Sequence, residues 1–117
     1  MSNHYHLLIG FGHKEEVKKF ITNFHNSSSR LLNEQQRVEG RKVWWNYWDR
    51  IIRDEMDFYK HLNYIHHNPV KHNLANQMLG WLYSSYDHYQ NRHGNEWVDS
   101  VFEKYPIINF TPQGVTF

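Results

Sequence analysis

Two histidines near the start of the chain, His4 and His6, are spaced so that they can bind one metal ion. In an extended strand, side chains two positions apart point to the same face, so both imidazoles would reach one divalent cation. The chain holds ten histidines in 117 residues, and at that density chance alone gives about one pair with this spacing. The spacing by itself therefore fits a metal site and a pair of surface histidines about equally well.

A tyrosine and an asparagine, Tyr64 and Asn68, form a second candidate pair in the segment YIHHNPV. Their four-residue spacing places a phenol and an amide on the same face of a helix. The alternative is structural, with Tyr64 half-buried and Asn68 ending the helix before Pro69. His66 and His67 lie between the pair, but neighbouring helical positions diverge by about 100° and cannot both face one ion.

Residues 41–53 combine aromatic rings with cationic side chains, the two groups that single-stranded nucleic acid requires. Bases stack on rings, while Arg and Lys neutralise phosphates. The candidates for these contacts are Arg41, Lys42, Trp44, Trp48, Arg50 and Arg53. On a strand, Trp44, Trp48 and Arg50 would share one face, and Trp45 would occupy the other. Core packing is the competing interpretation for at least one of the tryptophans.

Composition limits the kinds of protein that this chain can be. Its 117 residues, 39% of them hydrophobic, suffice for one domain with a modest core. Cysteine is absent, which excludes disulfides, thiol catalysis and Cys-ligated metals. We expect a cytoplasmic protein without membrane contact, because no apolar stretch is long enough for a span and the start does not resemble a signal peptide. Residues 1–53 carry a net charge of +4, so a polyanion should bind there.

The elements that position the candidate residues follow from apolar spacing and from glycine and proline. Residues 3–11 and 43–52 are rich in residues that favour strands, which predicts two strands. Residues 14–36 lack glycine and proline and repeat apolar residues at helical spacing, which predicts a long helix.

A second helix is predicted to begin after Asp54 as its N-cap and to end at Asn68. Its predicted buried stripe consists of Phe58, Leu62 and Ile65. Residues 94–117 are predicted to form an irregular tail.

Three motifs, in this order, resemble a known family. The start MSNHYHLLI is similar to the metal-binding strand MPNHxHLL of the IS200-like, REP-associated tyrosine transposases, which belong to the HUH single-strand endonucleases. The segment YWDRIIRDEMDFYKHLNYIHHNPVKHNLA resembles the family's helix with the catalytic tyrosine and its YIxxNPV signature. The segment WLYSSYDHY resembles the closing W-x-x-SSY motif. The motifs extend over residues 2–89, and their joint occurrence makes the resemblance specific.

The resemblance implies a chemistry for the candidate residues. The implied ligands of a divalent ion, Mg²⁺ or Mn²⁺, are His4, His6 and Asn68. Tyr64 would attack single-stranded, hairpin-forming DNA to give a 5′-phosphotyrosine link, so that the strand is cleaved and rejoined. Lys71 joins the expected DNA-binding residues, and His66 or His67 is a candidate base for Tyr64. The alternatives are a DNA-binding remnant without catalysis and a histidine-rich metal-binding domain.

The resemblance also implies a fold. We expect an α+β domain over residues 1–93, with an antiparallel sheet and helices packed on one face, as in ferredoxin-like HUH domains, followed by the tail 94–117. The family's first strand, first helix and second strand have no counterpart in this sequence, so the domain is expected to be N-terminally truncated. A strand from the tail (107–110 or 115–117) or a second copy of the chain in a homodimer would complete the sheet.

Overall fold

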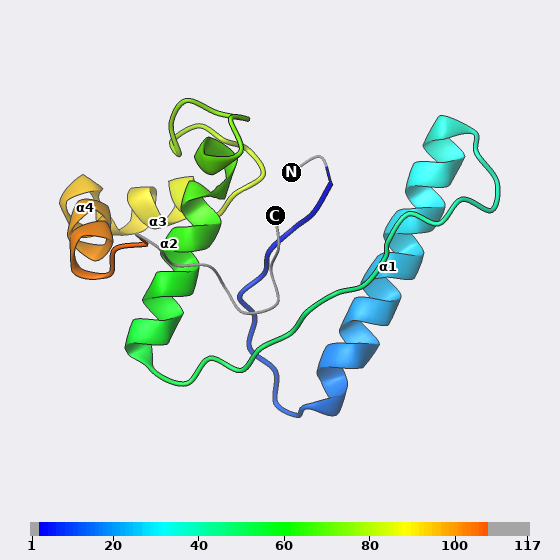
Figure 1. The fold of residues 1–117 in the computed structure, drawn as a ribbon, viewed down its shortest axis with the longest axis horizontal. Coiled ribbons are helices and arrows are strands. Elements are labelled where there is room, and N and C mark those ends of the chain that lie inside the picture. The colour runs from blue at the N-terminus through cyan, green and yellow to red at the C-terminus, as the bar shows by residue number, and fades with distance from the viewer. Residues whose placement is uncertain (1–2, 108–117) are drawn as a thin grey trace. The chain divides into compact units, whose positions relative to one another are not determined.

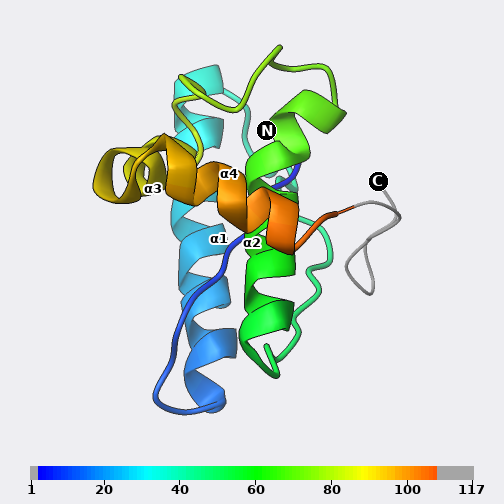
Figure 2. The same cartoon turned by 90° about the vertical axis from the view of Figure 1, so that its left-hand side faces the viewer.

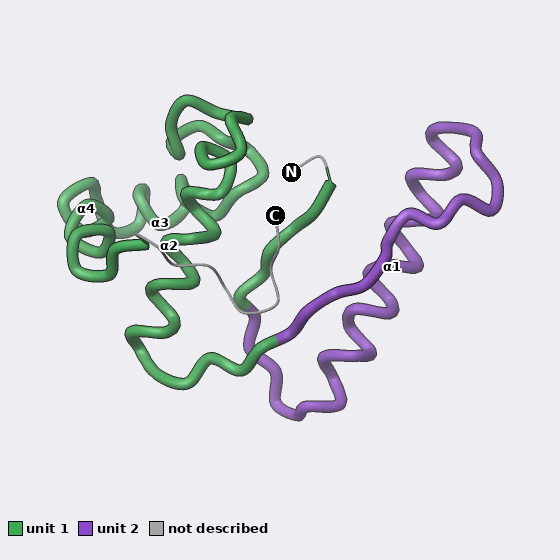
Figure 3. Tube along the Cα trace, in the orientation of Figure 1, with its two compact units in different colours: residues 1–8, 50–117 green, residues 9–49 purple. Residues whose placement is uncertain are grey.

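The computed structural model describes residues 3–107, in which extended segments connect the helices (Figure 1). The helices are α1 (Glu15–Gln36), α2 (Glu55–Lys71), α3 (Tyr86–His93) and α4 (Asn95–Lys104). The chain divides into two compact units (Figure 3). The first unit joins residues 1–8 to residues 50–117, and the second comprises residues 9–49. Within the described range, no helix is long and apolar enough to cross a membrane.

The predicted α+β fold with an antiparallel sheet is wrong for this chain, because residues 3–107 form helices and no strand. The segments predicted as strands, 3–11 and 43–52, carry no strand pairing with any other described residue. Aromatic and β-branched residues favour an extended backbone, but a strand also needs a neighbour that completes its hydrogen bonds. Apart from residue 107, the tail segments 107–110 and 115–117 lie outside the described residues.

Helix α1 confirms the long helix predicted for residues 14–36. Two acidic residues in its first turn, Glu15 and Glu16, lie where the helix dipole favours negative charge. The helix ends at Arg37, whose backbone is left-handed with φ of 56°. The N–H of Val38 then donates to the Asn33 carbonyl at 2.9 Å, which closes the last turn.

The segment after α1 returns along this helix within the second unit. Arg41 and Asn33 exchange two hydrogen bonds of 3.0 Å, one from the Arg41 Nε and one to the Arg41 carbonyl. Further on, the Trp44 Nε1 donates to the Ser28 Oγ at 2.7 Å. These side-chain bonds hold residues 41–44 against the C-terminal half of α1.

Helix α2 begins as predicted but ends later. The Asp54 side chain accepts the Asp57 N–H at 2.8 Å, which confirms Asp54 as the N-cap. The predicted end at Asn68 is wrong, because the helix continues to Lys71 with Pro69 inside its last turn. Proline there removes a single backbone hydrogen bond, and the Pro69 carbonyl still accepts the N–H of Leu74 at 2.9 Å.

The core of the first unit lies where α3 and α4 meet α2. Its buried apolar side chains are Leu62, Tyr64, Tyr86, Val98 and Val101. Helix α4 crosses α2 (Figure 2), and the Asn63 Nδ2 fastens the two by donating to the carbonyls of Val101 (3.1 Å) and Tyr105 (2.9 Å). The predicted irregular tail is therefore helical over Asn95–Lys104. The spacing of Val98 and Val101, three residues apart and both buried, is the helical signal that was missed.

Candidate functional site

Helix α2 presents Tyr64 and Asn68 on one buried face. Only 3% of Tyr64 and 2% of Asn68 is exposed. Their four-residue spacing stacks the two side chains one turn apart, as the sequence indicated. A phenol and an amide at this depth need polar partners, because burying such groups without hydrogen bonds is costly.

The extended N-terminal residues supply partners for both side chains. The His4 Nε2 lies 3.1 Å from the Asn68 Oδ1. The His6 ring meets the Tyr64 ring edge-on, with 5.6 Å between the ring centroids. The His4 and His6 rings are themselves in edge contact at 5.1 Å. The structure therefore brings together the three candidate metal ligands and the candidate nucleophile, all within one compact unit.

The surroundings of both histidine rings favour the neutral form. Burial, followed by electrostatic interactions with His4, His72 and Lys71, lowers the pKa of His6 to about 4. Burial also lowers the pKa of His4, although the hydrogen bond with Asn68 opposes this effect. A neutral imidazole keeps a lone pair on one nitrogen, which is the form that binds metal ions.

The donor set fits a divalent cation. Two adjacent ligands of an octahedral ion with bonds of about 2.1 to 2.2 Å lie about 3.0 to 3.1 Å apart, and His4 Nε2 and Asn68 Oδ1 have a separation of 3.1 Å. Among residues 3–107, no three His, Cys, Asp or Glu side chains are grouped so as to hold a metal. The candidate site instead combines two imidazoles with an amide oxygen. The amide oxygen is a ligand type that suits Mg²⁺ or Mn²⁺, whereas imidazoles generally suit Zn, Cu, Fe or Ni.

A lysine contacts the phenol of Tyr64. The Lys71 Nζ lies 3.4 Å from the Tyr64 hydroxyl and 5.0 Å from the ring centroid. Sequence reasoning placed Lys71 among the DNA-binding residues and missed this contact, although two residues seven apart lie on the same face of a helix.

His66 and His67, the two candidate bases, do not share the surroundings of Tyr64. His66 is 3% exposed, and its Nε2 lies 2.8 Å from the Ser85 Oγ. Its ring also contacts Tyr86 and Tyr89 of α3, and burial lowers the pKa of His66 to about 4. His66 thus connects α2 to α3. His67 is half-buried on the same helix.

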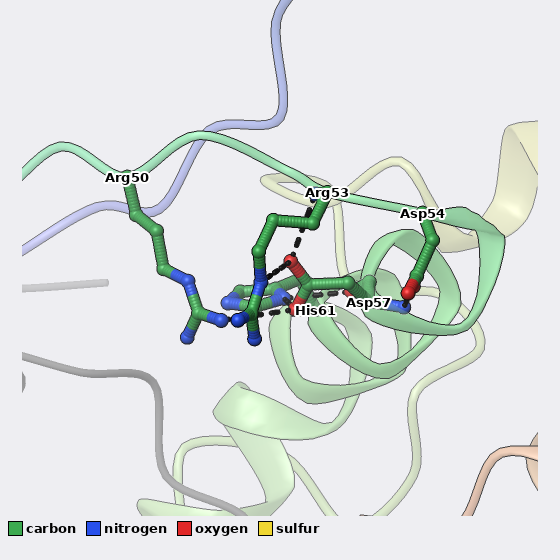
Figure 4. A network of polar contacts seen from close by, with 5 residues as sticks. All are labelled: Arg50, Arg53, Asp54, Asp57 and His61. Carbon is green, nitrogen blue, oxygen red and sulfur yellow. Dashed lines mark hydrogen bonds and ion pairs between the residues drawn. The ribbon is translucent and has the colours of Figure 1, made fainter.

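The Asp57 carboxylate contacts two of the three arginines in the predicted DNA-binding segment, Arg50 and Arg53. The Asp57 Oδ1 lies 3.4 Å from the Arg50 Nη2, and the Oδ2 accepts the Arg53 N–H at 3.1 Å (Figure 4). Burial alone would raise the pKa of Asp57. The hydrogen bond from the Arg53 N–H and the charges of His61, Arg50 and Arg53 outweigh this effect, so the pKa lies below its usual value. The Arg53 guanidinium is more weakly held, at 3.8 Å from the carboxylate, and its side chain is 74% exposed.

The tryptophans of the second unit differ in their surroundings. Trp44 is half-buried, with its ring stacked on His25 at 4.9 Å and its Nε1 bonded to Ser28. Trp45 and Trp48 are 73% and 72% exposed. The Lys42 Nζ lies 4.3 Å from the Trp45 ring centroid. Sequence reasoning placed Trp45 on the face of a strand opposite Trp44 and Trp48, but this segment does not form a strand.

The histidine pair, the tyrosine and the amide lie in the first two of the three motifs identified in the sequence. The sequence profile of the family described as "Transposase IS200 like" matches residues 1–68, and the chain belongs to this family. It is 29% identical over 96 residues to a Haemophilus influenzae protein named "Putative REP-associated tyrosine transposase", which covers 74% of this chain and 54% of the relative. It is 34% identical over 47 residues to the REP-associated tyrosine transposase of Escherichia coli K12, covering 39% of this chain and 28% of the relative. The chain thus spans about half the length of the first relative and a smaller share of the second. No solved structure matches it.

Proposed function

We propose that this chain carries the catalytic residues of a transposase that cleaves and rejoins single-stranded DNA through a 5′-phosphotyrosine link. The observation that carries the proposal is the 3.1 Å contact between His4 and Asn68. This contact supports the proposal because it joins two of the three motifs of the sequence and involves two of the residues that we propose as metal ligands. The names of the two relatives support a tyrosine as the reactive residue.

In the proposed reaction, Tyr64 is the nucleophile. Its hydroxyl oxygen attacks the phosphorus and loses its proton to water, while the bond from phosphorus to the 3′ oxygen breaks and that oxygen leaves as a 3′-hydroxyl after protonation. His4, His6 and Asn68 would hold a divalent ion, which supplies Lewis-acid polarisation of the phosphate when bound. The strand is rejoined when a 3′-hydroxyl attacks the phosphotyrosine and releases Tyr64.

Lys71 has a role in both directions of this reaction. Its ammonium lies 3.4 Å from the oxygen that forms and breaks the bond to phosphorus. Negative charge develops on that oxygen whenever the phosphotyrosine bond breaks, and a cation at hydrogen-bond distance stabilises such charge. This electrostatic role differs from that of the base for which sequence reasoning considered His66 or His67.

Both units provide contacts suited to single-stranded DNA. In the second unit, the exposed rings of Trp45 and Trp48 offer surfaces on which bases can stack, and the ammonium of Lys42 lies beside the Trp45 ring. In the first unit, the exposed Arg53 can neutralise phosphate. Arg41, Arg50 and Trp44 also have structural contacts, so we assign their main role to holding these segments in place.

A covalent-capture experiment tests the proposal. The full chain is incubated with a single-stranded hairpin oligonucleotide and Mn²⁺, and a denaturation-resistant protein–DNA adduct is sought by gel electrophoresis. We expect the adduct with the wild type, none with Tyr64→Phe, and an undiminished amount with the control Tyr86→Phe, since Tyr86 lies on α3, outside the group formed by His4, His6, Tyr64 and Asn68. Adduct formation by Tyr64→Phe would refute the assignment of the nucleophile. DNA binding without any adduct in the wild type would instead favour a non-catalytic DNA-binding protein.

A further inference from the structure

His4 lies between two amide oxygens. Its Nδ1 is 2.6 Å from the Asn3 Oδ1, and its Nε2 is 3.1 Å from the Asn68 Oδ1. A neutral imidazole has one ring N–H, and both of these oxygens can only accept. The ring can therefore donate to one of its neighbours and must meet the other with a lone pair.

The lengths of the two contacts point to one of the two tautomers. The Asn3 contact is the shorter, at 2.6 Å, and a hydrogen bond there requires the N–H to be on Nδ1. The Nε2 lone pair then faces the Asn68 oxygen. Two lone pairs at this distance repel each other, whereas a cation bound to both atoms removes the repulsion.

The orientation of the Asn68 amide supports this arrangement. If the amide were turned, its Nδ2 would donate to His4 and no ion would be needed. In the structure the Nδ2 is buried and has no hydrogen-bond partner among the described residues. The amide thus directs its oxygen to His4 even though its nitrogen is left without a hydrogen bond.

We propose that Asn3 orients His4 for metal binding by accepting the Nδ1–H and keeping the Nε2 lone pair directed at the ion. This inference rests on the metal site of the proposed function and adds a positioning residue to it. Histidines that bind metal ions typically donate their other ring N–H to an oxygen acceptor, and loss of the acceptor weakens metal binding. Asn3 is exposed, so its replacement should leave the packing of the first unit unchanged.

The test measures Mn²⁺ binding to the full chain by isothermal titration calorimetry. We expect Asn3→Ala to weaken the affinity by roughly 10- to 100-fold, with no change in melting temperature. Asn3→Asp keeps an acceptor and should bind at least as tightly as the wild type. The control, Asn76→Ala, removes another exposed asparagine from the first unit and should have no effect. In the metal-free protein, ¹⁵N NMR of the imidazoles should show the proton of His4 on Nδ1.

Two results separate this inference from the proposal on which it rests. If His4→Ala abolishes Mn²⁺ binding while Asn3→Ala binds as the wild type does, the role of Asn3 is refuted and the metal site stands. A His4 proton on Nε2 in the metal-free wild type also refutes the role of Asn3. If the wild type does not bind Mn²⁺, or if His4→Ala binds it equally well, the metal site and the role of Asn3 both fail.

Discussion

Replacing Asp57 by asparagine tests how the segment before α2 is held to the helix that carries Tyr64. The Asp57 side chain is 9% exposed and receives the Arg53 N–H at 3.1 Å and the Arg50 guanidinium at 3.4 Å. Asparagine keeps the shape of the side chain but removes its charge. Hydrogen bonds to a charged group contribute about 1.5 to 3 kcal/mol, whereas the 3.8 Å contact with the exposed Arg53 guanidinium adds little. We expect Asp57→Asn to lower the free energy of unfolding by about 1.5 to 3 kcal/mol, roughly a 10- to 150-fold change in the folding equilibrium.

The pH dependence of this difference has a definite sign. The pKa of Asp57 is lower in the folded protein than its ordinary value of about 3.9. A carboxyl group with a lowered pKa stabilises the fold fully above its unfolded pKa and loses that contribution as the pH falls through the folded value. The difference between wild type and Asp57→Asn should therefore be constant from pH 7 to about pH 5 and shrink below about pH 4.

Urea denaturation followed by circular dichroism at 222 nm measures these stabilities, because the described chain is helical. Glu55→Gln is the matched control, since Glu55 is an exposed carboxylate in the same first turn of α2. It reports the interaction with the helix dipole alone, about 0.3 to 1 kcal/mol. The reasoning is refuted if Asp57→Asn is no more destabilising than Glu55→Gln at pH 7, or if its effect persists undiminished at pH 2.

Two further predictions concern the proposed reaction and the DNA surface. Lys71→Gln should slow single-turnover adduct formation at saturating DNA by about tenfold, the lower end of the range for a hydrogen bond to a charged group, because the contact is long at 3.4 Å. Lys71→Arg should restore part of the rate, and an unchanged rate in Lys71→Gln would remove Lys71 from the mechanism. Trp45→Ala should weaken binding of a single-stranded oligonucleotide, measured by fluorescence anisotropy, by about 1 to 3 kcal/mol, while Trp44→Phe should mainly lower the melting temperature, because Trp44 has its ring stacked and its Nε1 bonded inside the second unit. If Trp44→Phe impairs affinity more than Trp45→Ala does, the assignment of the stacking surface is wrong.

The helices were predictable wherever their signals are local. The long run without glycine and proline predicted α1 to within one residue of its observed start, and Asp54 marked the start of α2. Hydrogen bonds within four residues produce both features, so the sequence nearby contains the information. The end of α2 was mispredicted because Pro69 in a last turn costs one hydrogen bond and need not end a helix.

The strands could not be judged in the same way, because pairing depends on residues distant in the sequence. Residues 43–52 have the composition of a strand, but what holds this segment is specific to its side chains. Trp44 bonds to Ser28, and Arg41 bonds to Asn33, both on α1. Without a pleated sheet, the alternation of faces fails, and Trp45 and Trp48 are exposed together while Trp44 packs.

The sequence predicted only part of the buried face of α2. Apolar spacing predicted a stripe of Phe58, Leu62 and Ile65, yet only Leu62 of these three is buried. The helix instead buries six side chains with polar groups, Asp57, His61, Asn63, Tyr64, His66 and Asn68. Buried polar groups are uncommon unless each has a partner. The partners differ among these residues and separate them into two groups.

One group of these polar residues holds the fold together. Asp57 binds the segment before the helix, and Asn63 binds backbone carbonyls at the end of α4. His66 binds the Ser85 hydroxyl at the start of α3. Tyr64 and Asn68 differ, because each contacts a side chain that can itself bind a phosphate or a metal ion, Lys71 in the first case and His4 in the second. Asp57, Asn63 and His66 hold neighbouring segments to α2, so Tyr64 and Asn68 are the two buried polar residues to which we assign the proposed chemistry.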